Sequence, residues 1–166
     1  LPDIKYKLQK VNGIDEGGKL IVKGDNVMQG YMKAEKAGVL QPLSDGWYDT
    51  GDIVKIDDDG YMTIQGRVKR FAKIGGEMVS LTAVEQMLDK LYPQSLQGVL
   101  VVADEKKGEQ LILMTNKQEA NLQEIREFFK QQGLSELWMP KKVIYEKNIP
   151  VVGSGKFDYV AAEKML

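Results

Sequence analysis

The sequence contains no cysteine and no histidine. Without cysteine there can be no disulfide framework and no thiolate metal site. The absence of histidine as well excludes a Ser-His-Asp triad, a Cys-His dyad and a His-ligated zinc site. Any chemistry must therefore rely on lysine, arginine, carboxylates and hydroxyl groups, and no metal site is predicted in this chain.

The chain also lacks a large net charge and a long apolar run. Its 23 Lys and Arg side chains are balanced by 24 Asp and Glu, so the formal net charge is −1. A chain with this charge balance has no net positive field that would attract a polyanion such as nucleic acid, so no nucleic-acid partner is predicted. No apolar run approaches the roughly 20 residues that span a bilayer, and the start does not resemble a signal peptide. We expect the chain to be soluble by itself and, because it begins with Leu1, to be part of a longer protein.

The first part of the sequence indicates strands. Short extended runs are separated by glycine turns, as in IKYKLQKV (4–11) and KLIVKG (19–24). Residues 52–65 alternate apolar and polar side chains around Asp57-Asp58-Asp59-Gly60, which predicts a β-hairpin. Residues 27–44 have no clear period and are interpreted as loop or short helix.

The pattern after Gly66 predicts an α+β unit. Residues 67–80 should form a hairpin around Gly75-Gly76, with further strands at 98–103, 110–115 and 142–146. Helices are predicted at 81–91, at 121–132 and, as a short terminal helix, at 159–166.

Two of these helices carry clear apolar faces. In the first, Val84, Leu88 and Leu91 share one face, and Ser80 or Thr82 can provide the N-cap. In the second the face is formed by Leu122, Ile125 and Phe129, and Gly133 can end the helix in a left-handed conformation.

Segment 46–52, GWYDTGD, precedes the first predicted hairpin. Asp49, Gly51 and Asp52 could serve turn formation alone. Alternatively, the two oxygens of the Asp52 carboxylate can accept hydrogen bonds from both hydroxyls of a ribose. From this segment alone both interpretations stay open.

Segment 66–85, GRVKRFAKIGGEMVSLTAVE, begins with basic residues. Its alternating charges could simply be a solvated strand face. Functionally, the planar fork of Arg67 suits ribose or phosphate oxygens, and Lys69 lies at the expected boundary, where a backbone rotation would be felt most. Gly75 and Gly76 permit a tight turn and a close approach of the backbone to a ligand.

Segment 150–156, PVVGSGK, is a glycine loop that ends in a lysine. It does not fit GxxxxGK, so it is not a Walker A loop. It could be only a connection to the last helix. Functionally it would present Lys156, a cation at neutral pH, to a phosphate.

Taken together and in this order, the three segments resemble the C-terminal part of the adenylate-forming superfamily of acyl-CoA synthetases, nonribosomal peptide synthetase adenylation domains and luciferases. In that family a Tyr-x-Thr-Gly-Asp segment supplies a ribose-binding aspartate. The resemblance therefore assigns nucleotide binding to Tyr48, Thr50 and Asp52. It assigns a further nucleotide contact to Arg67 and the hinge between two domains to Lys69.

Two further matches concern the later part of the chain. The family's Lys-x-x-Gly-x-x-Val run is filled by Lys73, Gly76 and Val79, Glu85 falls at its helix glutamate, and Leu81 stands where many ligases have proline. The resemblance implies that Lys73, Gly75 and Gly76 face the thiol acceptor.

The family's C-terminal Pro-x-x-x-x-Gly-Lys segment is filled by Pro150, Gly155 and Lys156. In the family this segment carries the lysine required for adenylation. The resemblance therefore assigns the catalytic role to Lys156.

The implied fold is a β-rich subdomain followed by a small α+β C-terminal lid domain. Residues 1–66 would be the last subdomain of a large adenylation domain, 67–69 the hinge, and 70–166 the lid. The wording GWYDTGDIV, GRVKRFAKIGGEMVSL and VGSGKFD is most similar to bacterial acyl-acyl carrier protein synthetases fused to 2-acylglycerophosphoethanolamine acyltransferases.

For the full-length parent this resemblance implies ATP/AMP and Mg2+ as cofactors, and the rest of the adenylation domain, a fatty acid and acyl carrier protein or coenzyme A as partners. It implies a location on the cytoplasmic side of a bacterial inner membrane. The fragment itself is expected to hold no cofactor and to be inactive alone. Alternatives are a fragment of an acyl-CoA ligase, a carrier-protein docking module without catalysis, and an α+β domain without a ligand.

Overall fold

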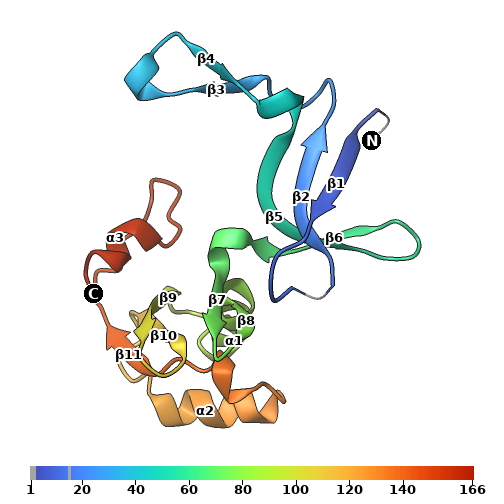
Figure 1. Ribbon diagram of the computed structural model, residues 1–166. Coiled ribbons are helices and arrows are strands. Elements are labelled where there is room, and N and C mark those ends of the chain that lie inside the picture. Colours follow the sequence, from blue (N-terminus) through green and yellow to red (C-terminus); the bar gives the residue numbers. More distant parts are fainter. Residues whose placement is uncertain (1–2, 15) are drawn as a thin grey trace. The chain divides into compact units, whose positions relative to one another are not determined.

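The computed structural model describes residues 3–14 and 16–166 (Figure 1). The chain divides into two compact units, Leu1–Lys69 and Arg70–Leu166. The first is built almost entirely of strands and the second of strands and helices. The α+β fold class predicted from the sequence is confirmed.

The first unit is built around a four-stranded antiparallel sheet. Its spatial order is β1-β2-β5-β6, with bounds Lys5–Gln9, Gly18–Lys23, Tyr48–Ile56 and Met62–Arg67. The predicted hairpin at 52–65 is confirmed. Its turn is fixed by Asp57, whose carboxylate accepts the backbone N–H groups of Asp59 at 3.1 Å and of Tyr61 at 2.8 Å.

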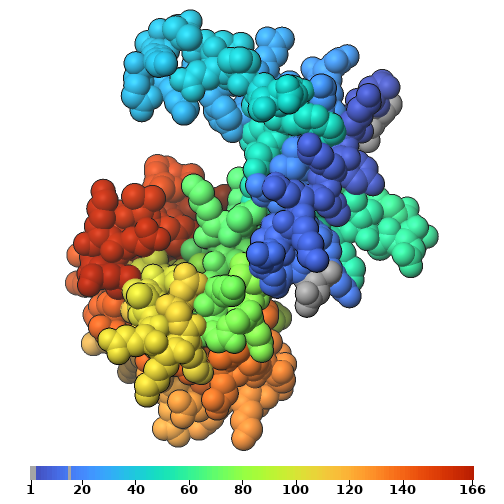
Figure 2. All heavy atoms as spheres, in the orientation of Figure 1, coloured from blue at the N-terminus to red at the C-terminus, as the bar shows by residue number. Residues whose placement is uncertain are grey.

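Residues 27–44 were predicted as loop or short helix, and this prediction is wrong in part. They contain a second antiparallel hairpin, β3 (Gly30–Met32) with β4 (Leu40–Pro42). Two 3-10 turns flank β4, η1 (Ala34–Lys36) and η2 (Ser44–Gly46). Strands of three residues are too short to show a period of two. The hairpin extends as an arm from the main sheet of its unit, light blue in Figures 1 and 2.

The first unit has a thin core. Among its described residues only the hydrophobic side chains of Ile21, Ile53 and Val54 are buried. Several large apolar side chains are instead exposed, among them Tyr6, Met28, Tyr31, Met32, Val39, Leu40, Tyr61, Met62 and Ile64. Because burial of apolar surface is the main force that stabilises a fold, this unit offers little to stabilise itself.

The second unit is built around a five-stranded sheet in which β10 (Gly108–Thr115) is central. Strand β10 pairs antiparallel with β9 (Gln97–Asp104) along its whole length and parallel with β11 (Lys142–Tyr145). At Gly108 it also meets β7 (Phe71–Ile74), which forms the predicted hairpin with β8 (Glu77–Ser80). The predicted strands at 98–103, 110–115 and 142–146 are confirmed. The hairpin predicted at 67–80 is confirmed only from Phe71, because Arg67 ends β6 and Val68–Arg70 form a 3-10 turn.

Two hydrophobic cores lie on opposite faces of this sheet, because successive residues of a strand point to opposite sides. Val99, Leu111 and Leu113 pack with α1 and α2 in the larger core. The alternate residues Leu100 and Met114 belong to a smaller core, together with Ile149, Phe157 and Ala162. The C-terminal segment therefore covers the second face of the sheet.

Both long helices of the second unit begin at a side-chain N-cap. Helix α1 (Leu81–Leu91) has Ser80 as its N-cap, whose hydroxyl accepts the backbone N–H of Ala83 at 3.3 Å, which decides between Ser80 and Thr82. Helix α2 (Leu122–Gln131) is capped by Asn121 and followed by Gly133 at φ 72°.

Short helical turns complete the second unit. They are η3 (Val68–Arg70) at the boundary of the two units, η4 (Glu136–Trp138) and helix α3 (Tyr159–Glu163). Helix α3 begins where predicted, but it ends at Glu163 and not at 166, so its predicted end is wrong. One predicted core residue of α2 is wrong, since Leu122 is exposed whereas Ile125 and Phe129 are fully buried. Leu122 is the first residue of its helix, whereas the two buried residues lie one and two turns further along. No helix in the described part of the chain is both long and apolar enough to cross a membrane.

Candidate active site

Asp52 and Arg67 face each other across neighbouring strands of the first unit. They are direct partners in the β5–β6 register, and Arg67 Nε lies 2.7 Å from Asp52 Oδ1. The Asp52 side chain is 20% exposed and that of Arg67 is 66% exposed. A carboxylate has several acceptor positions, so Asp52 can accept further hydrogen bonds beside its contact with Arg67.

The turn before Asp52 is held by its own side chains. Thr50 Oγ1 donates to the backbone carbonyl of Leu20 at 2.9 Å and accepts the N–H of Asp52 at 3.1 Å. Gly51 has φ 73°, a conformation that is unstrained only for glycine. Its N–H donates to Asp49 Oδ1 at 2.9 Å. Thr50 thus has a structural task in addition to the nucleotide role predicted for it.

A hollow of about 470 Å3 lies beside this turn, lined among others by Tyr48, Thr50, Arg67 and Lys69. The structure therefore brings these four predicted residues together at one place. Asp52 lies next to the hollow through its pair with Arg67.

Lys19, Tyr31 and Asp49 also line the hollow, although the sequence motifs did not single them out as ligand-binding. Lys19 Nζ lies 2.5 Å from Asp49 Oδ2, and the ring of Tyr31 lies 6.5 Å from that of Tyr48. A hydrogen bond with Tyr48 raises the pKa of Tyr31. The Lys19–Asp49 contact joins residues 30 positions apart, so no local pattern could reveal it.

The hairpin predicted to face a thiol acceptor belongs to the second unit. Gly75 and Gly76 form its turn with φ 60° and 94°, and Lys73 and both glycines are exposed. A Cβ on Gly76 would meet nothing within 4 Å. These glycines are therefore required by the backbone conformation, and space alone would admit a side chain at Gly76.

Lys156 is exposed at the end of a closed loop of the second unit. The Val152 N–H donates to the Lys156 carbonyl at 2.9 Å and the Gly155 N–H donates to the Val152 carbonyl at 2.8 Å. Val151 and Phe157 form an isolated antiparallel bridge, and Phe157 is buried in the smaller core. The backbone of Lys156 is thus fixed while its side chain reaches solvent.

The predicted residues therefore form two groups. Tyr48, Thr50, Asp52, Arg67 and Lys69 belong to the first unit, and Lys73, Gly75, Gly76 and Lys156 belong to the second. Within residues 3–14 and 16–166 there is no group of three His, Cys, Asp or Glu side chains that could hold a metal ion.

Comparison with known proteins gives one consistent class of relatives, although no family model matches the chain. The chain is 30% identical over 145 residues to enterobactin synthase component E of Escherichia coli, covering 86% of this chain and 27% of that protein. It is 33% identical over 141 residues to the long-chain-fatty-acid–CoA ligase FadD13 of Mycobacterium tuberculosis, covering 84% and 28%.

The fold is also found among solved structures. That of o-succinylbenzoate CoA synthetase from Bacillus subtilis, in complex with its acyl-adenylate intermediate, matches with a TM-score of 0.76 at 26% identity, over 98% of this chain and 34% of the synthetase. The chain thus spans between a quarter and about a third of the proteins it matches.

Proposed function

We propose that this chain, whose sequence relatives and structural neighbours are adenylate-forming ligases, is the C-terminal part of an ATP-dependent acid–thiol ligase. In this proposal the first unit completes the nucleotide site of a large domain. The second unit is a mobile lid that carries Lys156. The parent joins a carboxylic acid to AMP and then transfers the acyl group to a thiol.

The observation that carries the proposal is the Asp52–Arg67 pair beside the hollow of the first unit. Asp52 offers an oxygen to a ribose hydroxyl while Arg67 holds its other oxygen. The guanidinium has further N–H donors for ribose or phosphate oxygens. Tyr48 and Thr50 would form one side of the same nucleotide site.

Lys156 is proposed to act in the first step, in which a carboxylate attacks the α-phosphate of ATP and pyrophosphate leaves. Two anions must approach each other, so a lysine cation placed between them stabilises the charge that develops in the transition state. The fixed backbone of the loop favours this role, because a preorganised cation needs little reordering during the reaction. Mg2+, which would neutralise the other phosphates, would be held by the nucleotide and by residues outside this chain.

The second step requires Lys156 to withdraw and a thiol to approach. We assign the pivot to Lys69, the last residue of the first unit, because a domain rotation needs only a few backbone torsions. The turn Lys73–Gly76 would then face the thiol carrier. Its exposed glycines allow the carrier's prosthetic arm to approach the backbone closely.

The acid is proposed to be a fatty acid and the acceptor an acyl carrier protein, with the acyl group passed on to a lysophospholipid at the bacterial inner membrane. This more specific proposal is supported by the amino-acid sequences of the three motifs, which resemble those of acyl-acyl carrier protein synthetases. The names of the relatives span a long-chain fatty acid and o-succinylbenzoate, so they do not choose the acid. Coenzyme A is the alternative acceptor.

The test measures pyrophosphate release by the full-length protein from ATP and a long-chain fatty acid, with holo acyl carrier protein or coenzyme A as acceptor. Lys156→Ala should lower the rate of adenylate formation on the order of a hundredfold to a thousandfold. It should spare acyl transfer from preformed adenylate. Lys164→Ala, which removes an exposed lysine from the same C-terminal segment, is the control and should change neither step.

Each outcome has a distinct meaning. Unchanged pyrophosphate release in Lys156→Ala would show that this lysine is not the adenylation cation. Stimulation by coenzyme A alone would keep the ligase and reject the carrier-protein acceptor. No release with any acid would reject the ligase and leave a binding module.

A further inference from the structure

Three side chains of the second unit, Arg70, Glu85 and Tyr159, form a single half-buried cluster. Arg70 Nη2 lies 2.5 Å from Glu85 Oε1, and the Tyr159 hydroxyl donates to the same oxygen at 3.0 Å. The guanidinium carbon of Arg70 lies 3.8 Å from the centre of the Tyr159 ring. Each member of the cluster therefore contacts both others.

The cluster also includes the backbone of β9. The N–H of Val99 donates to Glu85 Oε1 at 2.7 Å, and Arg70 Nη1 donates to the Val99 carbonyl at 3.3 Å. A single carboxylate oxygen thus accepts hydrogen bonds from an arginine, a tyrosine and a main-chain amide. The side chains of Arg70 and Glu85 are 19% and 13% exposed, so loss of one partner would leave a poorly hydrated charge unpaired.

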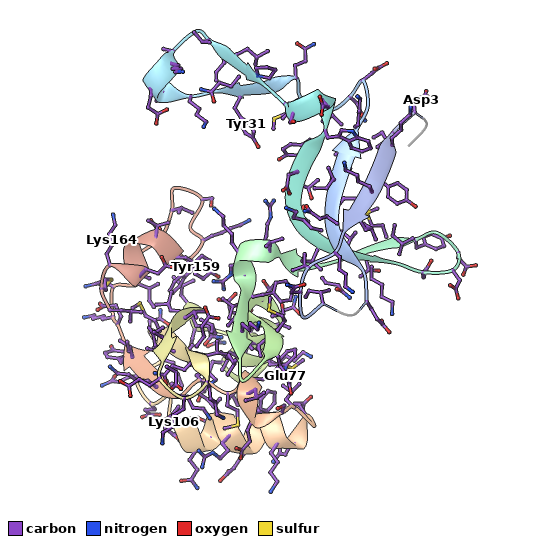
Figure 3. All side chains as sticks on the ribbon, in the orientation of Figure 1. Asp3, Tyr31, Glu77, Lys106, Tyr159 and Lys164 are labelled. Atoms are coloured by element: carbon purple, nitrogen blue, oxygen red, sulfur yellow. The ribbon has the colours of Figure 1, made fainter. Side chains whose placement is uncertain are left out.

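The cluster connects two parts of the chain to which the proposed function assigns a role. Arg70 directly follows Lys69, the proposed hinge, and is the first residue of the second unit. Tyr159 begins α3, three positions after Lys156, and its ring packs against that of Phe157 at 4.8 Å. Figure 3 labels Tyr159 beside the start of α3. The cluster therefore joins the residue after the proposed hinge to the loop at 150–156 that carries Lys156, called the lysine loop below.

Resting on the proposed function, we propose that Arg70, Glu85 and Tyr159 are positioning residues that make Lys156 turn with the hinge as one body. None of them needs to touch the substrate. A rotation at Lys69 moves Arg70 first, and the cluster transmits that rotation through Glu85 to α3 and the lysine loop. Without it the loop would be held on its sheet only by the packing of Phe157 and its neighbours.

The state of Tyr159 agrees with this role. Burial, followed by the charge of Glu85, raises the pKa of Tyr159 to about 12. The hydroxyl is therefore protonated at neutral pH and can donate its hydrogen bond. Replacing Glu85 by glutamine should lower this pKa towards the ordinary value, which gives the contact a spectroscopic signature.

A matched control lies on the other face of the same sheet. The Tyr92 hydroxyl donates to Glu124 Oε2 at 2.7 Å, and Tyr92 belongs to the larger core between α1 and α2. This is also a tyrosine–carboxylate hydrogen bond of a buried ring. Tyr92 belongs to the larger core, whereas Phe157, next to Lys156, belongs to the smaller one, so Tyr92→Phe reproduces the chemical change without the proposed coupling.

The test compares Tyr159→Phe, Glu85→Gln and Tyr92→Phe in the full-length protein. Tyr159→Phe keeps the ring beneath Arg70 and removes only the hydroxyl, so the fold should survive. We expect adenylate formation to slow about tenfold, because small displacements of a positioned group are costly in rate. The KM for ATP and acyl transfer from preformed adenylate should change less than twofold. Tyr92→Phe should change neither rate by more than twofold.

Two additional measurements separate positioning from general loss of stability. In a Lys156→Ala background, Tyr159→Phe should cause no further loss of adenylation, since its effect passes through that lysine. In a hydrogen-exchange measurement, the backbone amides of Val152 and Gly155 should exchange faster in Tyr159→Phe than in the parent protein. Their exchange rates should be unchanged in Tyr92→Phe.

The inference would be overturned if Tyr159→Phe left both adenylation and loop exchange as in the parent protein, or if Tyr92→Phe had equal effects. A wild-type protein that formed no adenylate would instead refute the proposed function. In that case the exchange measurement would still decide whether the cluster holds the loop.

Discussion

Replacing Gly98 by alanine should push the lysine loop away from its sheet. Gly98 lies in β9, directly beneath the ring of Phe157, and a Cβ at this position would meet three ring carbons at 2.6 to 2.7 Å. Ordinary contacts of a Cβ begin at 3.4 Å, so the ring would have to retreat by 0.8 Å, the difference between 3.4 and 2.6, to restore an ordinary contact. Phe157 is only 7% exposed, and its neighbours leave little room for this movement.

The expected cost follows from the packing of that core. Overfilling a close-packed core destabilises by roughly 1–3 kcal/mol. The second unit has 97 residues (166 minus 69), and for a domain of this size each kcal/mol lowers the melting temperature by about 4–8 °C. Because Phe157 is bonded to Lys156, adenylation by the full-length protein should fall as well.

The assay is urea unfolding followed by tryptophan fluorescence. The chain has two tryptophans, one in each unit, so a Trp47→Phe background makes Trp138 report on the second unit alone. Gly153→Ala is the control, because Gly153 lies in the same loop and its Cβ would meet nothing within 4 Å. Adding Phe157→Leu to Gly98→Ala should recover part of the loss. Equal stability of Gly98→Ala and the parent would refute the packing described here.

Two further predictions concern the helix cap and the acid side of the pH range. Ser80→Ala should lower the free energy of unfolding of the second unit by about 0.5–2 kcal/mol, because it removes the N-cap of α1. Thr82→Ala should change this free energy by less than about 0.5 kcal/mol. An equal loss of stability in both variants would show that Ser80 does not cap the helix. Burial acts to raise the pKa of Asp49, but Lys19 and the Gly51 N–H together lower it below its ordinary value of 3.8. A lowered pKa in the folded state contributes stability above pH 3.8, and this stability is lost as the pH falls through the folded pKa. Asp49→Asn should therefore make the free energy of unfolding fall less steeply at acid pH. If NMR showed the Asp49 carboxyl titrating at or above pH 3.8, this prediction would be contradicted.

Local patterns predicted most of the fold because most of its elements have local causes. The helix at 81–91 has a 3.6-residue apolar period and an adjacent serine cap, and both are visible in eleven or twelve residues of sequence. The hairpin at 52–65 has its turn chemistry in Asp57–Gly60. The β3–β4 hairpin was missed because its strands are only three residues long. It is formed by pairing across a loop, and no residue pattern of that length is specific.

The candidate site shows the same division between local and distant causes. Asp52 and Arg67 could be named from their motifs, and the register of one hairpin explains why they meet. The cluster around Glu85 could not be assembled from the sequence, because its Tyr159 contact spans 74 positions. Sequence patterns report the residues of a site best when a single turn or hairpin positions them. The roles of these residues in catalysis stay predictions.

The unequal cores of the two units fit the proposed division of labour. A lid must keep its internal geometry while it moves, and the second unit has a sheet with a hydrophobic core on each face. The first unit buries few of its described apolar side chains and exposes many along β3, β4 and β6, as expected of a piece whose stability depends on a larger domain. In the proposed mechanism, torsion at a few backbone bonds around Lys69 would move Lys156 without disturbing the core of either unit. Arg70, the first residue of the cluster, follows Lys69 directly. A rotation at Lys69 would therefore be transmitted to the lysine loop through the contacts of the cluster.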